Sequence, residues 1–108
     1  MPSEKTLFEK IRDGEVSAKK YPELEDEDFF VIDDIRPQAP IHVLLITKKP
    51  FPALSDLPND VTLKLLPKLK SIAQLFFKKS SHRIQINTGS PYQEVPHFHA
   101  HIYGGEDE

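Results

Sequence analysis

The stretch that decides the fold is His97-Phe98-His99-Ala100-His101, in which three histidines alternate with apolar residues. Because side chains alternate across a strand, this pattern predicts a β-strand with the three imidazoles on one face. The opposite face is apolar and should pack against a helix. The strand would then present a row of imidazoles to a cleft or to solvent.

The spacing of these histidines leaves three interpretations open. One imidazole could attack phosphorus while its neighbours orient it, bind phosphoryl oxygens or protonate the leaving group, because histidine titrates near neutral pH. Neutral imidazole is also a common zinc ligand. At about 3.3 Å per residue, however, His97 and His101 are roughly 13 Å apart, so one ion could bind two of the three histidines and hardly the third. A solvated histidine cluster fits poorly, because the intervening residues are apolar.

Outward from the histidines, the chain predicts further strands. Residues 83–87 alternate polar and apolar side chains and should form a hairpin with the histidine strand. Apolar runs at 29–32 and 41–47 predict buried strands, the second covered on both faces. A weaker strand around 18–21 would bring the number to five. The element order indicates an α+β fold with a five-stranded antiparallel sheet.

Two helices complete the predicted fold. A short N-terminal helix would be capped by Ser3 and stopped at Gly14. A long helix would begin at the cap pair Asn59 and Asp60, with a kink or break just before Pro67. The apolar positions at helical spacing in this long helix are Val61, Leu65, Leu69, Ile72 and Phe76.

Length and composition limit the class of protein. We expect a single domain over residues 1–108, because a chain of this size usually builds one core. A formal charge of −3 disfavours a nucleic acid polymer as partner. The absence of cysteine excludes disulfides and thiolate metal sites. Since the sequence shows neither a signal peptide nor a membrane-length apolar run, we expect a cytoplasmic protein without a membrane partner.

The region around the histidines resembles a known family. Residues 93–105 contain His-x-His-x-His followed by two apolar residues, which resembles the signature of the histidine triad (HIT) superfamily. Residues 34–42 read Asp-Ile-Arg-Pro-Gln-Ala-Pro-Ile-His and resemble a segment of the Hint branch, as do residues 8–11. The resemblance covers essentially the whole chain. It implies a five-stranded antiparallel sheet with one short and one long helix.

The resemblance also implies a homodimer in which the long helix and a sheet edge pair to extend the sheet across a two-fold axis. Apolar residues between Val61 and Phe77 cover more than one face of the predicted helix, which is consistent with such an interface.

The resemblance implies covalent catalysis on a nucleotide, with unequal roles for the histidines. By motif position His99 would be the nucleophile that forms a nucleotidyl-histidine. His101 would contact a phosphoryl oxygen, and His97 would help to position the nucleophile or the leaving group. His42 matches a fourth family histidine that completes a hydrogen-bonded chain.

Substrate-binding residues are also implied by motif position. Asp34 would accept hydrogen bonds from the ribose hydroxyls, and Asn87 would donate to the α-phosphate. The apolar walls around a purine base would be formed by Phe8, Ile11, Ile32 and Ile35, each equally plausible as core. The residues before the triad that would reach the phosphate or the leaving group are Gln93, Glu94 and Val95.

The resemblance therefore implies an enzyme that hydrolyses the P–N bond of purine nucleoside 5′-phosphoramidates, with AMP or GMP derivatives as ligands. Two departures from the Hint pattern, a loop one residue shorter and Tyr92 in place of a glycine, leave the substrate open. The acidic residues 106–108 favour an amine leaving group over a second nucleotide. The alternatives are a dinucleoside polyphosphate hydrolase and a non-catalytic nucleotide-binding regulatory protein. We expect no required cofactor and no catalytic metal, although the histidines could bind zinc.

Overall fold

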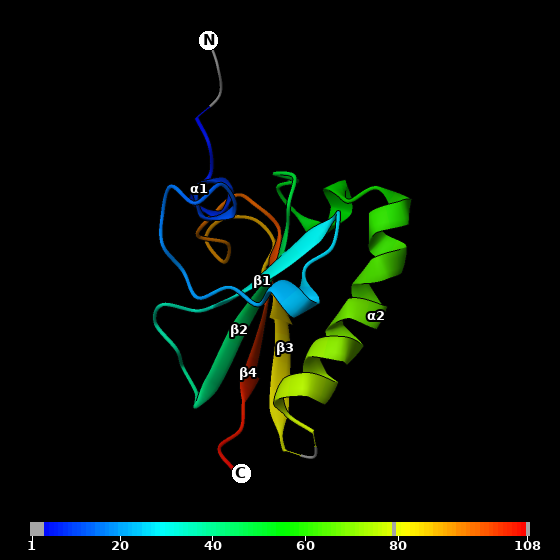
Figure 1. Ribbon diagram of the computed structural model, residues 1–108. Coiled ribbons are helices and arrows are strands. Elements are labelled where there is room, and N and C mark those ends of the chain that lie inside the picture. The colour runs from blue at the N-terminus through cyan, green and yellow to red at the C-terminus, as the bar shows by residue number, and fades with distance from the viewer. Residues whose placement is uncertain (1–3, 79, 108) are drawn as a thin grey trace.

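The computed structural model describes residues 4–78 and 80–107, which form a four-stranded sheet, two α-helices and two short 3₁₀ helices (Figure 1). The elements in chain order are α1 (Leu7–Arg12), η1 (Pro22–Leu24), β1 (Phe29–Asp33), β2 (Ile41–Thr47), η2 (Leu54–Asp56), α2 (Asn59–Phe76), β3 (His82–Ile86) and β4 (His99–Gly104). The α+β class and the two helices predicted from the sequence are confirmed.

The sheet is antiparallel with strand order β1-β2-β4-β3. The apolar strand β2 is central, and β3 pairs with β4 as the predicted hairpin. The five-stranded prediction is wrong for the described residues. Residues 19–21 run beside β1, but they form only the bridge Lys20–Ile32. The pairing stops there because Pro22, which has no backbone N–H, begins η1.

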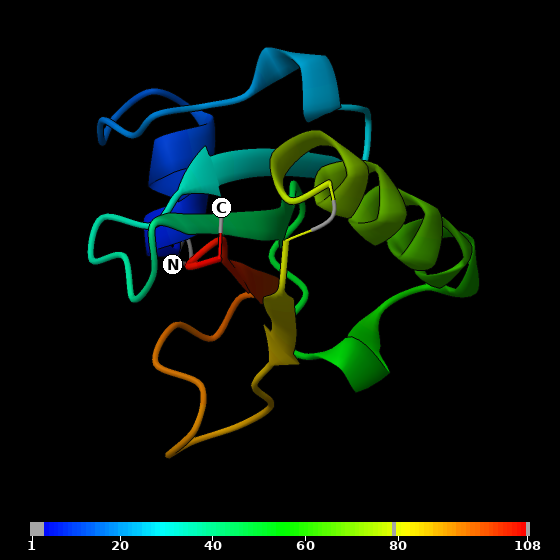
Figure 2. The same ribbon diagram turned by 90° about the horizontal axis from the view of Figure 1, so that it is seen from below.

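The two faces of the sheet bury separate apolar clusters. Helix α2 covers one face (Figure 2), where Ala100 and Ile102 of β4 belong to one cluster with Leu65 and Ile72 of the helix. Helix α1 lies at the other face, and its Phe8 belongs to the second cluster. The histidine side of β4 therefore faces the α1 side of the sheet.

Helix α2 differs from the prediction at two points. Asn59 and Asp60 do not cap it: the helix begins at Asn59, its N-cap is Pro58, and no side chain caps it. It also runs without a break through Pro67. The carbonyl that Pro67 leaves without an intrahelical donor belongs to Leu63, a residue 79% exposed, so water can satisfy it. Over the described part of the chain, no helix is long and apolar enough to cross a bilayer.

Helix α1 begins after Thr6, whose side chain accepts the N–H of Glu9, while the Glu9 side chain accepts the N–H of Thr6. This reciprocal capping box explains why the helix begins here. Ser3, the predicted cap, lies outside the described residues. Gly14 follows the helix with φ of 81°, as the predicted helix stop requires.

Candidate active site

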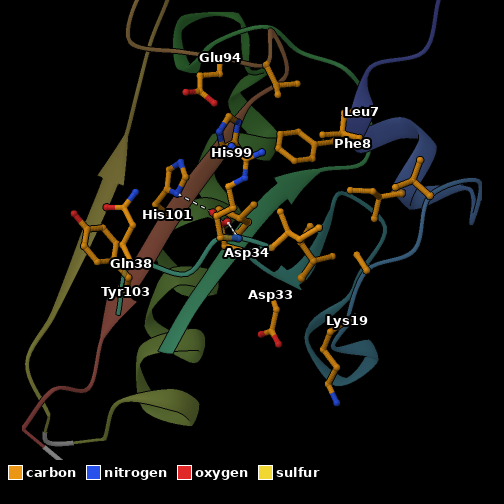
Figure 3. A pocket seen from close by; sticks show the side chains of 18 of the residues that line it. Leu7, Phe8, Lys19, Asp33, Asp34, Gln38, Glu94, His99, His101 and Tyr103 are labelled. Carbon is orange, nitrogen blue, oxygen red and sulfur yellow. Dashed lines mark hydrogen bonds and ion pairs between the residues drawn. The ribbon is translucent and has the colours of Figure 1, made fainter. Parts of the chain in front are cut away.

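A pocket of about 700 Å³ opens on the α1 side of the sheet (Figure 3). His99 and His101 from β4 line it together with Asp34, which follows β1. In Figure 3 the ring of Phe8 lies beside His99, with ring centroids 4.7 Å apart. The pocket thus joins an apolar wall to a group of imidazoles, an arrangement typical of small-molecule sites.

His99 is held with one nitrogen toward the protein. Its Nδ1 lies 2.8 Å from the backbone carbonyl oxygen of His97. A carbonyl only accepts hydrogen bonds, so Nδ1 of the neutral ring carries the proton. The lone pair is then on Nε2, and the side chain lines the pocket. This tautomer suits a nucleophile.

His97 does not share the strand position predicted for it. Strand β4 begins at His99, and the side chain of His97 is fully buried rather than facing a cleft. Its Nε2 lies 2.7 Å from the carbonyl oxygen of Thr47, and its Nδ1 lies 2.6 Å from Oγ1 of Thr6. Both ring nitrogens are therefore used within the protein. The sequence pattern correctly placed His99 and His101 on one face of a strand, but the prediction that His97 belongs to this strand and faces the cleft is wrong.

His42 and His101 form a directional pair across adjacent strands. The backbone N–H of Gln38 donates to Nδ1 of His42 at 3.0 Å, so the proton of His42 is on Nε2. That nitrogen lies 3.0 Å from Nδ1 of His101 and donates to it. Nε2 of His101 therefore carries a hydrogen, which makes this imidazole a donor at the pocket.

Burial lowers the pKa of each of these four imidazoles below the usual value of 6.5. Asp34 acts in the opposite direction on His42, His99 and His101, but desolvation is the larger effect. The four rings are therefore neutral at neutral pH, which is the state that the hydrogen-bond directions above require.

Among the residues that the structure describes, Asp34, His42 and His101 form a group that could hold a metal ion. Oδ2 of Asp34 lies 3.4 Å from Nε2 of His42 and 3.7 Å from Nδ1 of His101, close to the roughly 3.4 Å between ligands of tetrahedral zinc. The protonation does not fit as well. Nδ1 of His42 accepts from the Gln38 N–H, so its Nε2 carries the proton that a metal would have to displace.

The predicted apolar walls lie where the sequence placed them, with one difference. Phe8, Ile11 and Ile32 line the pocket and also belong to the core. Val95 lines the pocket and packs against the same cluster. Ile35 is 91% exposed and therefore forms part of the pocket rim, not of the core.

The residues predicted to meet the phosphate divide into two groups. Asn87 and Glu94 line the pocket. The side chain of Gln93 instead fastens two loops together: its Oε1 accepts the N–H of Gly89 at 2.9 Å, and its Nε2 donates to the carbonyl oxygen of Pro52 at 2.5 Å. Both ends of the Gln93 amide are therefore used in hydrogen bonds that connect the loop containing Gly89 to the loop containing Pro52.

Two pocket residues that the sequence did not single out, Gln85 and Tyr103, orient Asn87. The hydroxyl of Tyr103 donates to Oε1 of Gln85 at 3.1 Å, and Nε2 of Gln85 donates to Oδ1 of Asn87 at 3.0 Å. Because its oxygen is used in this way, Asn87 keeps its amide N–H groups for a ligand. The alternation of side chains was the available signal, because Gln85 and Asn87 are two residues apart, and Tyr103 pairs with Arg83, two residues before Gln85.

Comparison with known proteins agrees with the geometry. Residues 18–108 match the HIT domain family. A HIT-like protein of Chlamydia pneumoniae is 38% identical over 104 residues, which cover 93% of each chain. The crystal structure of a HIT family hydrolase from Legionella pneumophila has a TM-score of 0.81 at 36% identity, with 94% of each chain covered. That of a histidine triad nucleotide-binding protein from Candida albicans has a TM-score of 0.79 at 27% identity, covering 91% of this chain and 73% of the other.

The chain therefore shares its fold with both solved structures. The chain belongs to the HIT domain family.

Proposed function

We propose that this protein is a Hint-like hydrolase that cleaves the P–N bond of purine nucleoside 5′-phosphoramidates through a covalent intermediate on His99. The observation that carries the proposal is the protonation of His99: Nδ1 donates to the His97 carbonyl oxygen, so Nε2 has its lone pair available at the pocket. Nucleotide binding alone would not need a nucleophile held in this way.

The chemistry follows from the tautomers. Nε2 of His99 attacks the α-phosphorus, the P–N bond breaks, and the leaving nitrogen keeps the bonding pair and takes a proton from water. A second water then attacks the same phosphorus and gives a proton to the hydroxide left by the first step, the bond to Nε2 breaks with the electron pair returning to that nitrogen, and the nucleotide leaves with a neutral His99 restored. Nε2–H of His101 donates to a phosphoryl oxygen, which stabilises the charge that develops there.

The pocket provides a separate place for each part of the substrate. The apolar wall of Phe8, Ile11 and Ile32 suits a purine base. Asp34 lines the same pocket, with Oδ2 3.7 Å from Nδ1 of His101, and its carboxylate suits the ribose hydroxyls (Figure 3). Similarity to a HIT family hydrolase and to a histidine triad nucleotide-binding protein supports a nucleotide as the ligand.

The leaving group is inferred from charge. Glu94 lines the pocket close enough to His99 and His101 to favour their protonated forms electrostatically. A carboxylate there disfavours a polyanionic leaving group such as a second nucleotide and tolerates an amine. We therefore place phosphoramidates ahead of dinucleoside polyphosphates.

The experiment compares turnover of an AMP-amide and a diadenosine polyphosphate by the wild-type protein and by His99→Ala. We expect faster release of AMP from the amide, and its loss in the variant while AMP binding stays measurable. Faster turnover of the diadenosine substrate would favour the polyphosphate hydrolase, and AMP binding without turnover of either would favour the regulatory protein. Activity that is lost with a chelator and restored by zinc would contradict the metal-free mechanism.

We also propose that two copies pair through α2 and the sheet edge at β3. Strand β3 is the last strand of the sheet, and its Ile84 is 47% exposed. On α2, Leu63 and Leu66 are 79% and 73% exposed. Large exposed apolar side chains and an unpaired strand edge are each typical of an interface between subunits.

A further inference from the structure

The hydroxyl of Thr6 makes two hydrogen bonds of opposite direction. Its Oγ1 accepts the backbone N–H of Glu9 at 3.1 Å, which caps α1. The same oxygen lies 2.6 Å from Nδ1 of His97. The Thr6 side chain therefore hydrogen-bonds both to the first turn of α1 and to the imidazole of His97.

The direction of the second bond follows from the other side of the ring. Nε2 of His97 lies 2.7 Å from the carbonyl oxygen of Thr47, which can only accept, so Nε2 carries a hydrogen. Burial lowers the pKa of His97, so the ring is neutral and Nδ1 has a lone pair. Thr6 must therefore be the donor. The charged and titratable groups that act on this ring are Glu9 and Arg12 from α1 and His99 from β4.

The His97 ring is linked to the proposed nucleophile His99 through the backbone carbonyl group of His97. The backbone carbonyl oxygen of His97 accepts Nδ1–H of His99 at 2.8 Å. Because the His97 ring is fastened at both nitrogens and fully buried, its backbone carbonyl is held in place as well.

We propose that Thr6 is a positioning residue: its hydroxyl keeps His97 in the neutral Nε2–H tautomer and thereby holds His99 with Nε2 toward the pocket. The effect on catalysis rests on the proposed function, whereas the effect on the His97 tautomer does not. The competing explanation is that Thr6 only caps α1.

An isosteric pair of substitutions separates the two explanations. Asn and Asp are both good N-caps and can accept the Glu9 N–H. In Thr6→Asn the amide can also donate to Nδ1 of His97, so the neutral tautomer should persist. In Thr6→Asp the carboxylate can only accept, so Nδ1 must take a proton and His97 becomes a cation. Thr6→Ser keeps both bonds of the wild type.

The test records the ¹⁵N NMR signals of the His97 ring at pH 7 in the full-length chain, together with kcat/KM for an AMP-amide and the urea midpoint. We expect wild type, Thr6→Ser and Thr6→Asn to show a neutral Nε2–H ring and kcat/KM values within about threefold of one another. Thr6→Asp should show a doubly protonated ring and a kcat lowered about tenfold or more, with a urea midpoint matching that of Thr6→Asn.

A neutral His97 in Thr6→Asp, or wild-type kcat in that variant, would overturn the proposal. If Thr6→Asp does not fold, a changed His97 tautomer in folded Thr6→Ser would overturn it equally, and an unchanged one would support it. Should the wild-type protein fail to release AMP, the proposed function fails, and the NMR comparison alone still decides the role of Thr6.

Discussion

Nε2 of His42 lies 3.0 Å from Nδ1 of His101 and donates its proton to it. Without this donor, the neutral ring of His101 could carry its proton on either nitrogen. We expect His42→Leu to lower kcat/KM for an AMP-amide about tenfold or more, the cost of one buried hydrogen bond to a group in the site.

His42→Gln is the matched control, because the amide nitrogen of glutamine can reach the place of Nε2 and still donate. It should retain kcat/KM within about threefold of the wild type. Equal losses in the two variants would show that His42 acts through packing and not through its proton.

The pH dependence of kcat/KM should have one limb on the acid side. His99 attacks only as the neutral imidazole, and burial lowers its pKa below 6.5. Activity should therefore be constant from pH 8 down to about 6.5 and fall as the pH drops through the lowered pKa of His99. A steady-state profile between pH 4.5 and 8 checks this. Activity that rises with falling pH through this range would exclude a neutral nucleophile.

Asp34 is expected to bind the ribose hydroxyls, so removing its carboxylate should weaken substrate binding. We expect Asp34→Asn to lower kcat/KM for an AMP-amide roughly 10- to 100-fold, as for loss of hydrogen bonds to a charged group. The Asn variant should also discriminate less than the wild type between ribose and 2′-deoxyribose substrates. Unchanged discrimination in kcat/KM would assign Asp34 to the two histidines beside it and not to the sugar.

Tyr103 should act on the phosphate through Gln85 and Asn87. Tyr103→Phe removes only the hydroxyl, so we expect a two- to fivefold loss of kcat/KM, about 0.5–1 kcal/mol for a partly exposed neutral hydrogen bond. Asn87→Ala should lose more, and adding Tyr103→Phe to Asn87→Ala should change kcat/KM no further. Additive losses in this double-mutant cycle would disprove the relay.

The proposed dimer interface predicts a change of mass on substitution. Light scattering at micromolar concentration should give the mass of two chains for the wild type and of one chain for the Leu63→Glu/Leu66→Glu variant, because the charges would be buried without partners. Leu54→Glu, at a 41% exposed leucine on η2, is the control and should stay dimeric. A monomeric wild type would contradict the interface.

The sequence was sufficient to predict the strands that are marked by a pattern among neighbouring residues. Alternation at β4 and the apolar run of β2 predicted both strands, because period and burial are properties of neighbouring residues. The fifth strand could not be judged in the same way. Its residues are too few before Pro22, and whether a short segment pairs fully depends on the strand beside it.

The sequence indicated the residues of the candidate site, but it could not indicate which ring nitrogen of each histidine carries the hydrogen. The spacing and the resemblance indicated His99, His101 and His42, all of which the fold brings to one region. The state of each ring is fixed by backbone groups whose position the fold sets: the carbonyl oxygen of Thr47 is 50 residues from His97, and the N–H of Gln38 is four residues from His42 but outside its strand. Only the three-dimensional arrangement supplies these partners, so no local pattern could have revealed them.

The central claim is a covalent bond between the α-phosphorus and Nε2 of His99. The most direct measurement is mass spectrometry of the wild-type protein quenched in acid-free denaturant during turnover of an AMP-amide. We predict a mass increase of one nucleotidyl group on the peptide that contains His99, absent from His99→Ala. A wild-type enzyme that turns over the amide without any such adduct, or with the adduct on another residue, would contradict the account.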